Sequence, residues 1–254
     1  MKAMIPIVLI VGALLCSEVS AVEVLTFENG VNGVQILDGR VRAGRDTNWG
    51  GANVIAGHVS QPSTIIVDGM FGNGAGQIPA GAPIVDAKLR MYMYHNIAAD
   101  EDQTLHAHVL NVDLRSHTGN KDGAVEAGEM TWTKKSWPNV GWGANEDGSA
   151  GPVSGEDYSA DIYSVFNAVG LPAPDANVNE WFDIDLTSIV QDWQDGTYAN
   201  NGVLLMGQEG SGMYFWSTEQ SGFEPRMIVS IVPEPASAML MLLGASVLAR
   251  RRRR

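Results

Sequence analysis

Four side chains that are able to bind sugars recur at every second position of one segment. In Val85–Tyr94 the odd positions are apolar, whereas the even positions include Lys88, Arg90, Tyr92 and Tyr94. Strict alternation predicts a β-strand with one face in a core and one facing outward, where successive side chains lie about 6–7 Å apart. Aromatic rings stack on the apolar faces of sugars, and Lys or Arg binds carboxylate or sulfate groups. An ordinary solvent-facing sheet gives the same alternation.

The segment Leu105–Val112 alternates as well and follows a polar loop, Asn96–Gln103. The spacing predicts that it forms a hairpin with the preceding strand, so that His106 and His108 join the same outward face. Two imidazoles at this spacing are also able to meet one metal ion, although no third ligand is identifiable.

A second candidate region surrounds Trp49. Arg40, Arg42 and Arg45 precede it, and Arg40 and Arg42 are expected to share a strand face. Asn48-Trp49-Gly50-Gly51 reads as a loop from which the indole reaches a ligand. The alternative is that these arginines only pair with surface carboxylates. The other tryptophans divide into two groups: Trp137 and Trp142 lie in Gly-rich loops and are further stacking candidates, whereas Trp132, Trp181 and Trp193 are expected to pack in or at the core.

One loop has the ligand spacing of a calcium site. Thr118-x-Asn120-x-Asp122-Gly123 is followed, after five intervening residues, by Glu129, but Thr stands where an EF-hand has Asp. A structural calcium ion held by Asn120, Asp122 and Glu129 is therefore the candidate cofactor. The alternative is a polar surface loop with Gly123 in a left-handed turn.

No catalytic motif is present. The sequence has no His-Glu-x-x-His, Gly-x-Ser-x-Gly, Walker or dinucleotide-binding pattern. Its one cysteine, Cys16, lies before the expected cleavage site described below. The mature protein would therefore have no thiol to act as a nucleophile. A two-carboxylate glycosidase stays open, but no spacing singles out a pair. We expect a protein that is not an enzyme.

The elements that must position these side chains are short strands. Further strands are expected at Phe182–Leu186, Gly202–Met206, Met213–Ser217 and Arg226–Val232. One short helix is expected, capped by Thr187, with Ile189, Val190 and Trp193 on one side and its end at Asp195-Gly196. This pattern predicts an all-β fold, an antiparallel β-sandwich of the jelly-roll type with one short helix.

Composition agrees with such a fold and excludes some functions. The 254 residues include 29 Gly and 11 Pro, with 45% hydrophobic and 18% charged residues, which is a globular composition rich in turns. The net charge of −13 argues against nucleic-acid binding, which needs a basic face. A single cysteine excludes a disulfide scaffold.

Both ends read as targeting segments. Residues 1–21 have a positive start, an apolar run and small residues before a cleavage site after Ala21, so we expect a signal peptide cut by signal peptidase. At the other end, Pro233-Glu234-Pro235 is followed by an uncharged apolar run and by Arg250–Arg254. This order resembles the PEP-CTERM sorting signal over residues 232–254. The resemblance implies transient inner-membrane association, processing by an exosortase-type enzyme, and a final location at the cell surface or extracellular matrix of a Gram-negative-type bacterium.

Four segments of the body, residues 22–231, resemble DNRLRE-type domains in family order. They are Ile78–Tyr92, Met130–Thr133, Trp181–Trp193, and Phe215–Glu219 together with Pro225–Met227. The family includes carbohydrate-binding module family 96, so the resemblance implies a jelly-roll module that binds alginate or a related polysaccharide. Thr64–Asp68 lacks the arginine that the family has in this strand.

Together these features predict an exported, non-catalytic carbohydrate-binding protein whose partner is a polysaccharide. The alternatives are a structural matrix or adhesion protein without a small ligand, and a polysaccharide lyase or hydrolase. Without Lys2, Arg250–Arg254, Glu18 and Glu234, the body keeps ten basic and 27 acidic residues, a net charge of −17. Such a surplus repels polyanions at long range, so alginate-like chains would need a local basic stripe or a bridging cation.

Overall fold

The structure is a computed structural model that describes residues 21–47, 49–97, 102–115, 125–143, 151–172 and 176–233. Residues 1–20 of the expected signal peptide, Asn120, Asp122 and the sorting-signal residues Glu234 and Pro235 lie outside these ranges. Residues Val22–Val232 form one compact unit.

The longest strand, β5 (Ile84–Asn96), organises the fold. Ala87, Leu89, Met91 and Met93 are buried on one face, as the alternation predicts. The prediction is wrong at Val85, which is exposed. A register shift against β13 inverts the alternation at the start of the strand, so that Ile84 is buried in place of Val85.

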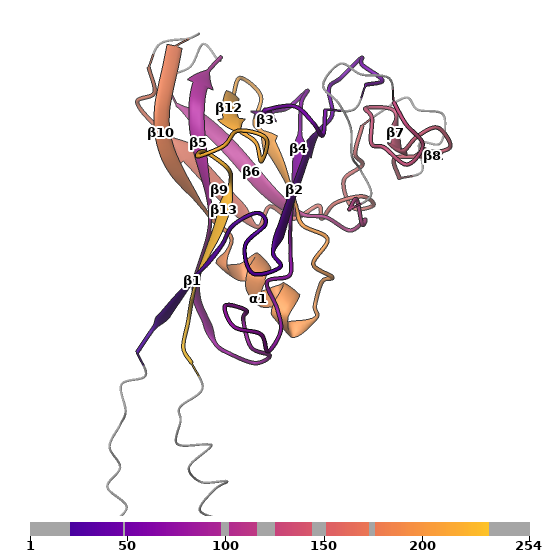
Figure 1. Cartoon of the computed structure of the whole chain (residues 1–254). Helices are drawn as coiled ribbons and strands as arrows, with labels where there is room; N and C mark the ends of the chain where they lie inside the picture. The colour runs from indigo at the N-terminus through magenta and orange to yellow at the C-terminus, as the bar shows by residue number, and fades with distance from the viewer. Residues whose placement is uncertain are drawn as a thin grey trace, which may run out of the picture. The chain divides into compact units, whose positions relative to one another are not determined.

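Two antiparallel sheets contain the long strands (Figure 1). The first sheet has the order β1-β13-β5-β12-β3, and β10 also pairs with β5. Its strands besides β5 are β1 (Glu23–Phe27), β3 (Val54–His58), β10 (Ala176–Asp185), β12 (Gly212–Trp216) and β13 (Arg226–Ile231). Several β5 residues that pair with β12 or β13 also pair with β10. β12 and β13 therefore lie along one edge of β5, and β10 lies along the opposite edge.

The second sheet has the order β2-β4-β11-β6-β9. Its strands are β2 (Gln35–Arg40), β4 (Ser63–Asp68), β6 (Gln103–Val109), β9 (Ser164–Ala168) and β11 (Val203–Gly207). Between β1 and β6 each successive strand changes sheet, so neighbours in the sequence face each other across the core. The expected all-β antiparallel sandwich is confirmed.

The expected hairpin of β5 and β6 is wrong. β6 pairs with β11 and β9 in the second sheet and has no pairing with β5. Both strands turn their apolar residues to the shared core, where Leu105 and Ala107 join Leu89 and Met91. The outward faces of the two strands therefore point in opposite directions.

A second, smaller core covers the outer face of the second sheet. Ile66 of β4 and Leu204 of β11 turn away from the main core and pack with Leu110, Trp142 and Tyr158. The covering segment includes a small pair of strands, β7 (Lys134–Ser136) and β8 (Val140–Gly141), which Figure 1 shows beyond β2 and β4. The outer face of the first sheet is consequently the open face of the sandwich.

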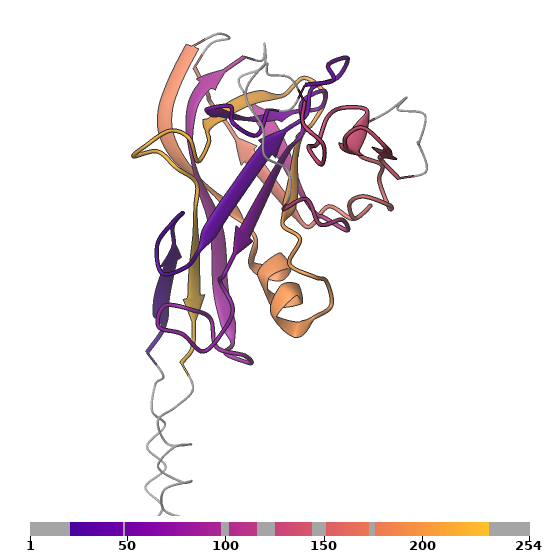
Figure 2. The ribbon, with the colours of Figure 1, turned by 45° about the vertical axis from the view of Figure 1, so that its right-hand side comes forward.

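The single helix of the described residues, α1 (Thr187–Asp195), lies at the end of the sandwich where β5 begins (Figure 2). Ile189, Val190 and Trp193 are buried as predicted, and Gly196 ends the helix in a left-handed conformation. The predicted capping by Thr187 is wrong, because Leu186 occupies the N-cap position. The Thr187 hydroxyl instead accepts a hydrogen bond from the Ala87 amide (3.0 Å), which fastens the helix to β5.

Within the described ranges, none of the helical structure has the length and apolar character that crossing a membrane requires.

Candidate functional site

Aromatic side chains gather on the open face of the first sheet, near the end of β5. We call this group the aromatic platform; it consists of Tyr92 and Tyr94 of β5, Trp181 of β10, Tyr214 and Trp216 of β12, and Phe223 of the loop between β12 and β13. Period-two alternation places the five members that belong to strands. Met213 and Phe215 of β12, and Ile184 of β10, enter the core, so the side chains at the alternate positions of these strands face outward.

The rings of the aromatic platform support one another. Tyr94 stacks on Trp216 with ring centroids 3.9 Å apart and an interplanar angle of 9°. Tyr92 meets the edge of Trp181 at 5.2 Å and lies 4.4 Å from Phe223. Such pairs contribute about 0.5–1.5 kcal/mol each beyond burial, so the rings are held in place without a ligand. Burial raises the pKa of the Tyr94 hydroxyl above its ordinary value.

Trp181 is the most accessible member of the aromatic platform. Its side chain is 37% exposed, whereas the other five members are half-buried. Trp181 therefore offers the largest aromatic surface to a ligand at this site. Its place opposite Tyr92 in the register of β10 and β5 fixes it at the outer edge of the sheet.

A hydrogen-bonded loop holds Phe223 over Tyr92. The Ser217 hydroxyl donates to the carbonyl oxygen of Ala52 (2.7 Å), and Thr218 donates to the Asp38 carboxylate through its amide (2.8 Å) and its hydroxyl (2.6 Å). Asp38 belongs to β2, so these bonds connect the two sheets. Burial, opposed by the bonds from Thr218, raises the pKa of Asp38 to about 6.

A row of charged side chains lies beside the aromatic platform. Arg90 donates two hydrogen bonds to the carboxylate of Asp183 on β10, from Nε (2.6 Å) and Nη2 (2.8 Å). These bonds hold the pKa of Asp183 below and that of Arg90 above its ordinary value. Arg226 stands opposite Arg90 in the register of β13 and β5, and its guanidinium lies 4.9 Å from the Trp181 ring centroid.

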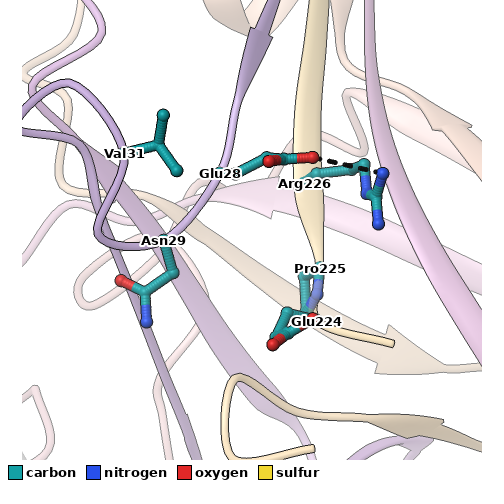
Figure 3. A pocket seen from close by; sticks show the side chains of 6 residues that line it. All are labelled: Glu28, Asn29, Val31, Glu224, Pro225 and Arg226. Carbon is teal, nitrogen blue, oxygen red and sulfur yellow. Dashed lines mark ion pairs between the residues drawn. The ribbon is translucent and has the colours of Figure 1, made fainter. Parts of the chain in front are cut away.

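A small pocket of about 130 Å³ lies where the loop after β1 meets the start of β13. It is lined by Glu28, Asn29, Val31, Glu224, Pro225 and Arg226. Figure 3 shows the Glu28 carboxylate pointing to the Arg226 guanidinium, with which it forms an ion pair of 3.2 Å. The pocket shares Arg226 with the charged row.

The structure brings Lys88, Arg90, Tyr92 and Tyr94 together on one face, as the alternation predicts. His106 and His108 are not part of it, because β6 belongs to the other sheet. His108 is buried beneath Tyr158, and its Nδ1 lies 3.0 Å from the Ser159 carbonyl oxygen. A carbonyl oxygen only accepts, so Nδ1 carries the proton. Burial lowers the pKa of His108.

The placement expected for Trp49 is also wrong. The indole is only 5% exposed, and its Nε1 donates to the Thr47 hydroxyl at 2.9 Å. The guanidinium of Arg40, itself buried, lies 4.4 Å from the Trp49 ring centroid and 5.8 Å from that of Tyr214. The buried Arg40 thus contacts both rings. Arg42 lies beyond the end of β2 and bridges to Arg45, so it shares no strand face with Arg40.

The remaining tryptophans differ from the prediction in two places. Trp193 is buried and Trp132 half-buried, as expected of packing residues. Trp142 is fully buried and donates to the Thr131 carbonyl oxygen, so this loop residue is not on the surface. Trp181 is the opposite case: it was expected to pack and is exposed.

Of the three expected calcium ligands, only Glu129 lies within the described residues. It is buried, and its Oε2 accepts a hydrogen bond from the amide of Glu126 (2.8 Å). Among the described residues no group of three metal-ligating side chains occurs. A calcium site that includes Asn120 and Asp122 stays a prediction.

A family model described as the PEP-CTERM protein-sorting motif matches residues 232–254. The predicted sorting motif is confirmed, and it supports exosortase-dependent export, membrane-associated processing and delivery to the cell surface. A search of curated proteins gave no match to this chain. The resemblance of the body to DNRLRE-type domains stays a hypothesis.

Proposed function

We propose that this surface-sorted protein binds carbohydrate through the aromatic platform and catalyses no reaction. The observation that supports this proposal most strongly is the concentration of aromatic rings on the open face of the sandwich, with Trp181 at its outer edge. Large apolar side chains on a surface mark interaction sites when they occur together.

The chemistry of the aromatic platform suits sugars. An aromatic ring packs against the C–H face of a sugar, and nearby polar groups hydrogen-bond the hydroxyls. The Tyr92 and Tyr94 hydroxyls supply such polar groups at the rings. A face made of strands is open at both sides and suits a length of polysaccharide better than an enclosed small molecule.

The carboxyl groups support a binding role over hydrolysis. A glycosidase needs a general acid whose pKa is raised at the site of the sugar. Asp183, the carboxylate beside the aromatic platform, has a lowered pKa because Arg90 binds it. Asp38 has a raised pKa but is buried beneath Thr218, away from the open face.

Affinity electrophoresis of the full chain, kept soluble in a mild detergent, tests this proposal. Native gels containing a panel of soluble polysaccharides would retard the protein for at least one polymer. Trp181→Ala and the double change Tyr92→Ala with Tyr94→Ala should reduce retardation at least tenfold. Trp137→Ala is the matched control, because Trp137 is half-buried next to β7, on the covering segment of the other sheet.

Each alternative function predicts a different result. Unchanged mobility with every polymer would overturn carbohydrate binding and favour a structural matrix or adhesion role. Release of reducing ends or unsaturated products from a polymer would show a hydrolase or lyase. Loss of retardation in Trp137→Ala but not in Trp181→Ala would move the binding site to the other face.

A further inference from the structure

Within the described part of the chain, the basic side chains beside the aromatic platform are already engaged by acidic ones. Arg90 forms two hydrogen bonds with Asp183, at 2.6 and 2.8 Å. Lys88 Nζ lies 3.1 Å from the carboxylate of Asp86, and Arg226 lies 3.2 Å from that of Glu28. Each pair has a net charge of zero.

The other cation near the aromatic platform is not on the surface. Arg40 is 5% exposed and lies against the rings of Trp49 and Tyr214. Because so little of this side chain is exposed, a negatively charged ligand on the open face has almost no access to its charge. Arg40 therefore packs against the aromatic platform as a buried side chain and is not a surface cation.

Acidic residues predominate around these pairs. Glu224 follows Phe223 directly, and Glu219, which is exposed, lies in the same loop. The body as a whole has ten basic and 27 acidic residues, so its net charge is −17. A polyanion approaching this face is repelled at long range and finds no uncompensated cation at short range.

We infer that the aromatic platform selects uncharged glycans and rejects polyuronates and sulfated glycans. This inference rests on the proposed carbohydrate binding and names the class of ligand. To bind Arg90, a ligand carboxylate would have to displace Asp183. Asp183 is already held in the adjacent strand, so its bonds to Arg90 do not cost the translational and rotational entropy that a free ligand loses on binding. Stacking on uncharged sugar rings requires no such exchange. Selectivity thus comes from blocked cations as well as from the rings.

Matched polymers that differ only in charge test this selectivity. Native gels of the full chain would contain hydroxyethyl cellulose or carboxymethyl cellulose, pullulan or carboxymethyl pullulan, and dextran or carboxymethyl dextran, with alginate as a natural polyuronate. We expect retardation by at least one neutral polymer and at least tenfold weaker retardation by its carboxymethyl form. Retardation by the neutral polymer should not change between low and moderate salt, because no ion pair with the ligand is formed.

A variant that frees one cation tests the mechanism. Asp183→Asn leaves Arg90 without its carboxylate, and we expect severalfold stronger retardation by the carboxymethyl polymers and by alginate. The control Asp195→Asn makes the same change of charge at an exposed position at the end of α1 and should gain nothing. The double change Arg90→Gln with Asp183→Asn should restore the wild-type preference. Thermal unfolding of each variant checks that the sandwich is intact.

The outcomes separate this inference from the function on which it rests. Retardation by no polymer at all overturns carbohydrate binding itself. Retardation by anionic polymers that equals or exceeds that by their neutral forms overturns the selectivity and leaves carbohydrate binding standing. A folded Asp183→Asn protein that gains no affinity for the carboxymethyl polymers shows that blocked cations do not set the preference, and the inference fails.

Discussion

Changing Asp38 to Asn tests the connection between the two sheets beneath the aromatic platform. The Asp38 carboxyl is buried and accepts two hydrogen bonds from Thr218, and its pKa is raised to about 6 from an ordinary 3.8. Asn has the shape of the protonated carboxyl and keeps an oxygen that accepts both bonds. Asp38→Asn should therefore fold and should behave as an Asp38 that never loses its proton.

The sign of the pH effect follows from the raised pKa. The folded state binds the proton more tightly than the unfolded chain, so the stabilisation is fully present below pH 3.8 and is lost as the pH rises through about 6. With these two pKa values, the free energy of unfolding that this proton contributes falls by roughly 1–2 kcal/mol between pH 5 and pH 7.5. Asp38→Asn does not lose this stabilisation. The free energy of unfolding of the variant, relative to that of the wild type, should therefore rise by the same amount from pH 5 to pH 7.5.

Urea unfolding followed by tryptophan fluorescence would measure the difference at pH 5, 6 and 7.5. At an m-value of about 2–3 kcal/mol/M, the gap between the two urea midpoints should change by roughly 0.5 M across this range. Other groups titrate in both proteins and cancel in the comparison. A gap that does not depend on pH, or one that grows toward acid, would refute the reasoning.

Three further predictions concern stability. Gly207→Ala should cost about 1–3 kcal/mol, because a Cβ there would lie 2.4 Å from the backbone oxygen of Gly57 where β11 meets β3, and an unchanged urea midpoint would contradict this. Asp183→Asn should lower the free energy of unfolding by less than about 1 kcal/mol at neutral pH, because both Asp183 and Arg90 are partly exposed. Since the pKa of Asp183 is lowered, this cost should vanish as acid protonates the carboxylate. A cost that persists in acid would argue against the pair with Arg90. His108→Gln should reduce the loss of stability that the protein shows in acid, measured by the urea midpoint. Because the pKa of His108 is lowered, the neutral imidazole stabilises the folded state above pH 6.5, and this stabilisation is lost as the pH falls. Equal pH profiles of variant and wild type would refute this.

Alternation in the sequence predicted which side chains of each strand face outward, but it did not predict which sheet receives the strand. For β5 it placed Lys88, Arg90, Tyr92 and Tyr94 on one face, as the structure has them. For β6 it gave the correct inward residues and the wrong partner strand. Period two depends on the pleat of a single strand, whereas pairing depends on contacts with segments such as β11, about a hundred residues further along.

Burial of the loop tryptophans depends on distant partners and has no local signal. Trp49 and Trp142 lie in Gly-rich segments that resemble surface loops. Trp49 is buried against the guanidinium of Arg40, and Trp142 is buried because a second core forms on Ile66 and Leu204. That second core does have a signal in the sequence: Ile65-Ile66-Val67 and Val203-Leu204-Leu205 are apolar at consecutive positions, which is typical of strands buried on both faces.

The antiparallel pairing of β1 with β13 sets Glu23 opposite Ile231, so the folded unit starts and finishes at one spot. Ile231 also pairs with Ile84, the first residue of β5, while Tyr92 lies eight residues further along that strand. At about 3.3 Å per residue this separation is roughly 26 Å. Val232, from which the chain continues into the tail, therefore lies at the end of the folded unit remote from the aromatic rings. An attachment made through this end does not occupy the surface of the aromatic platform.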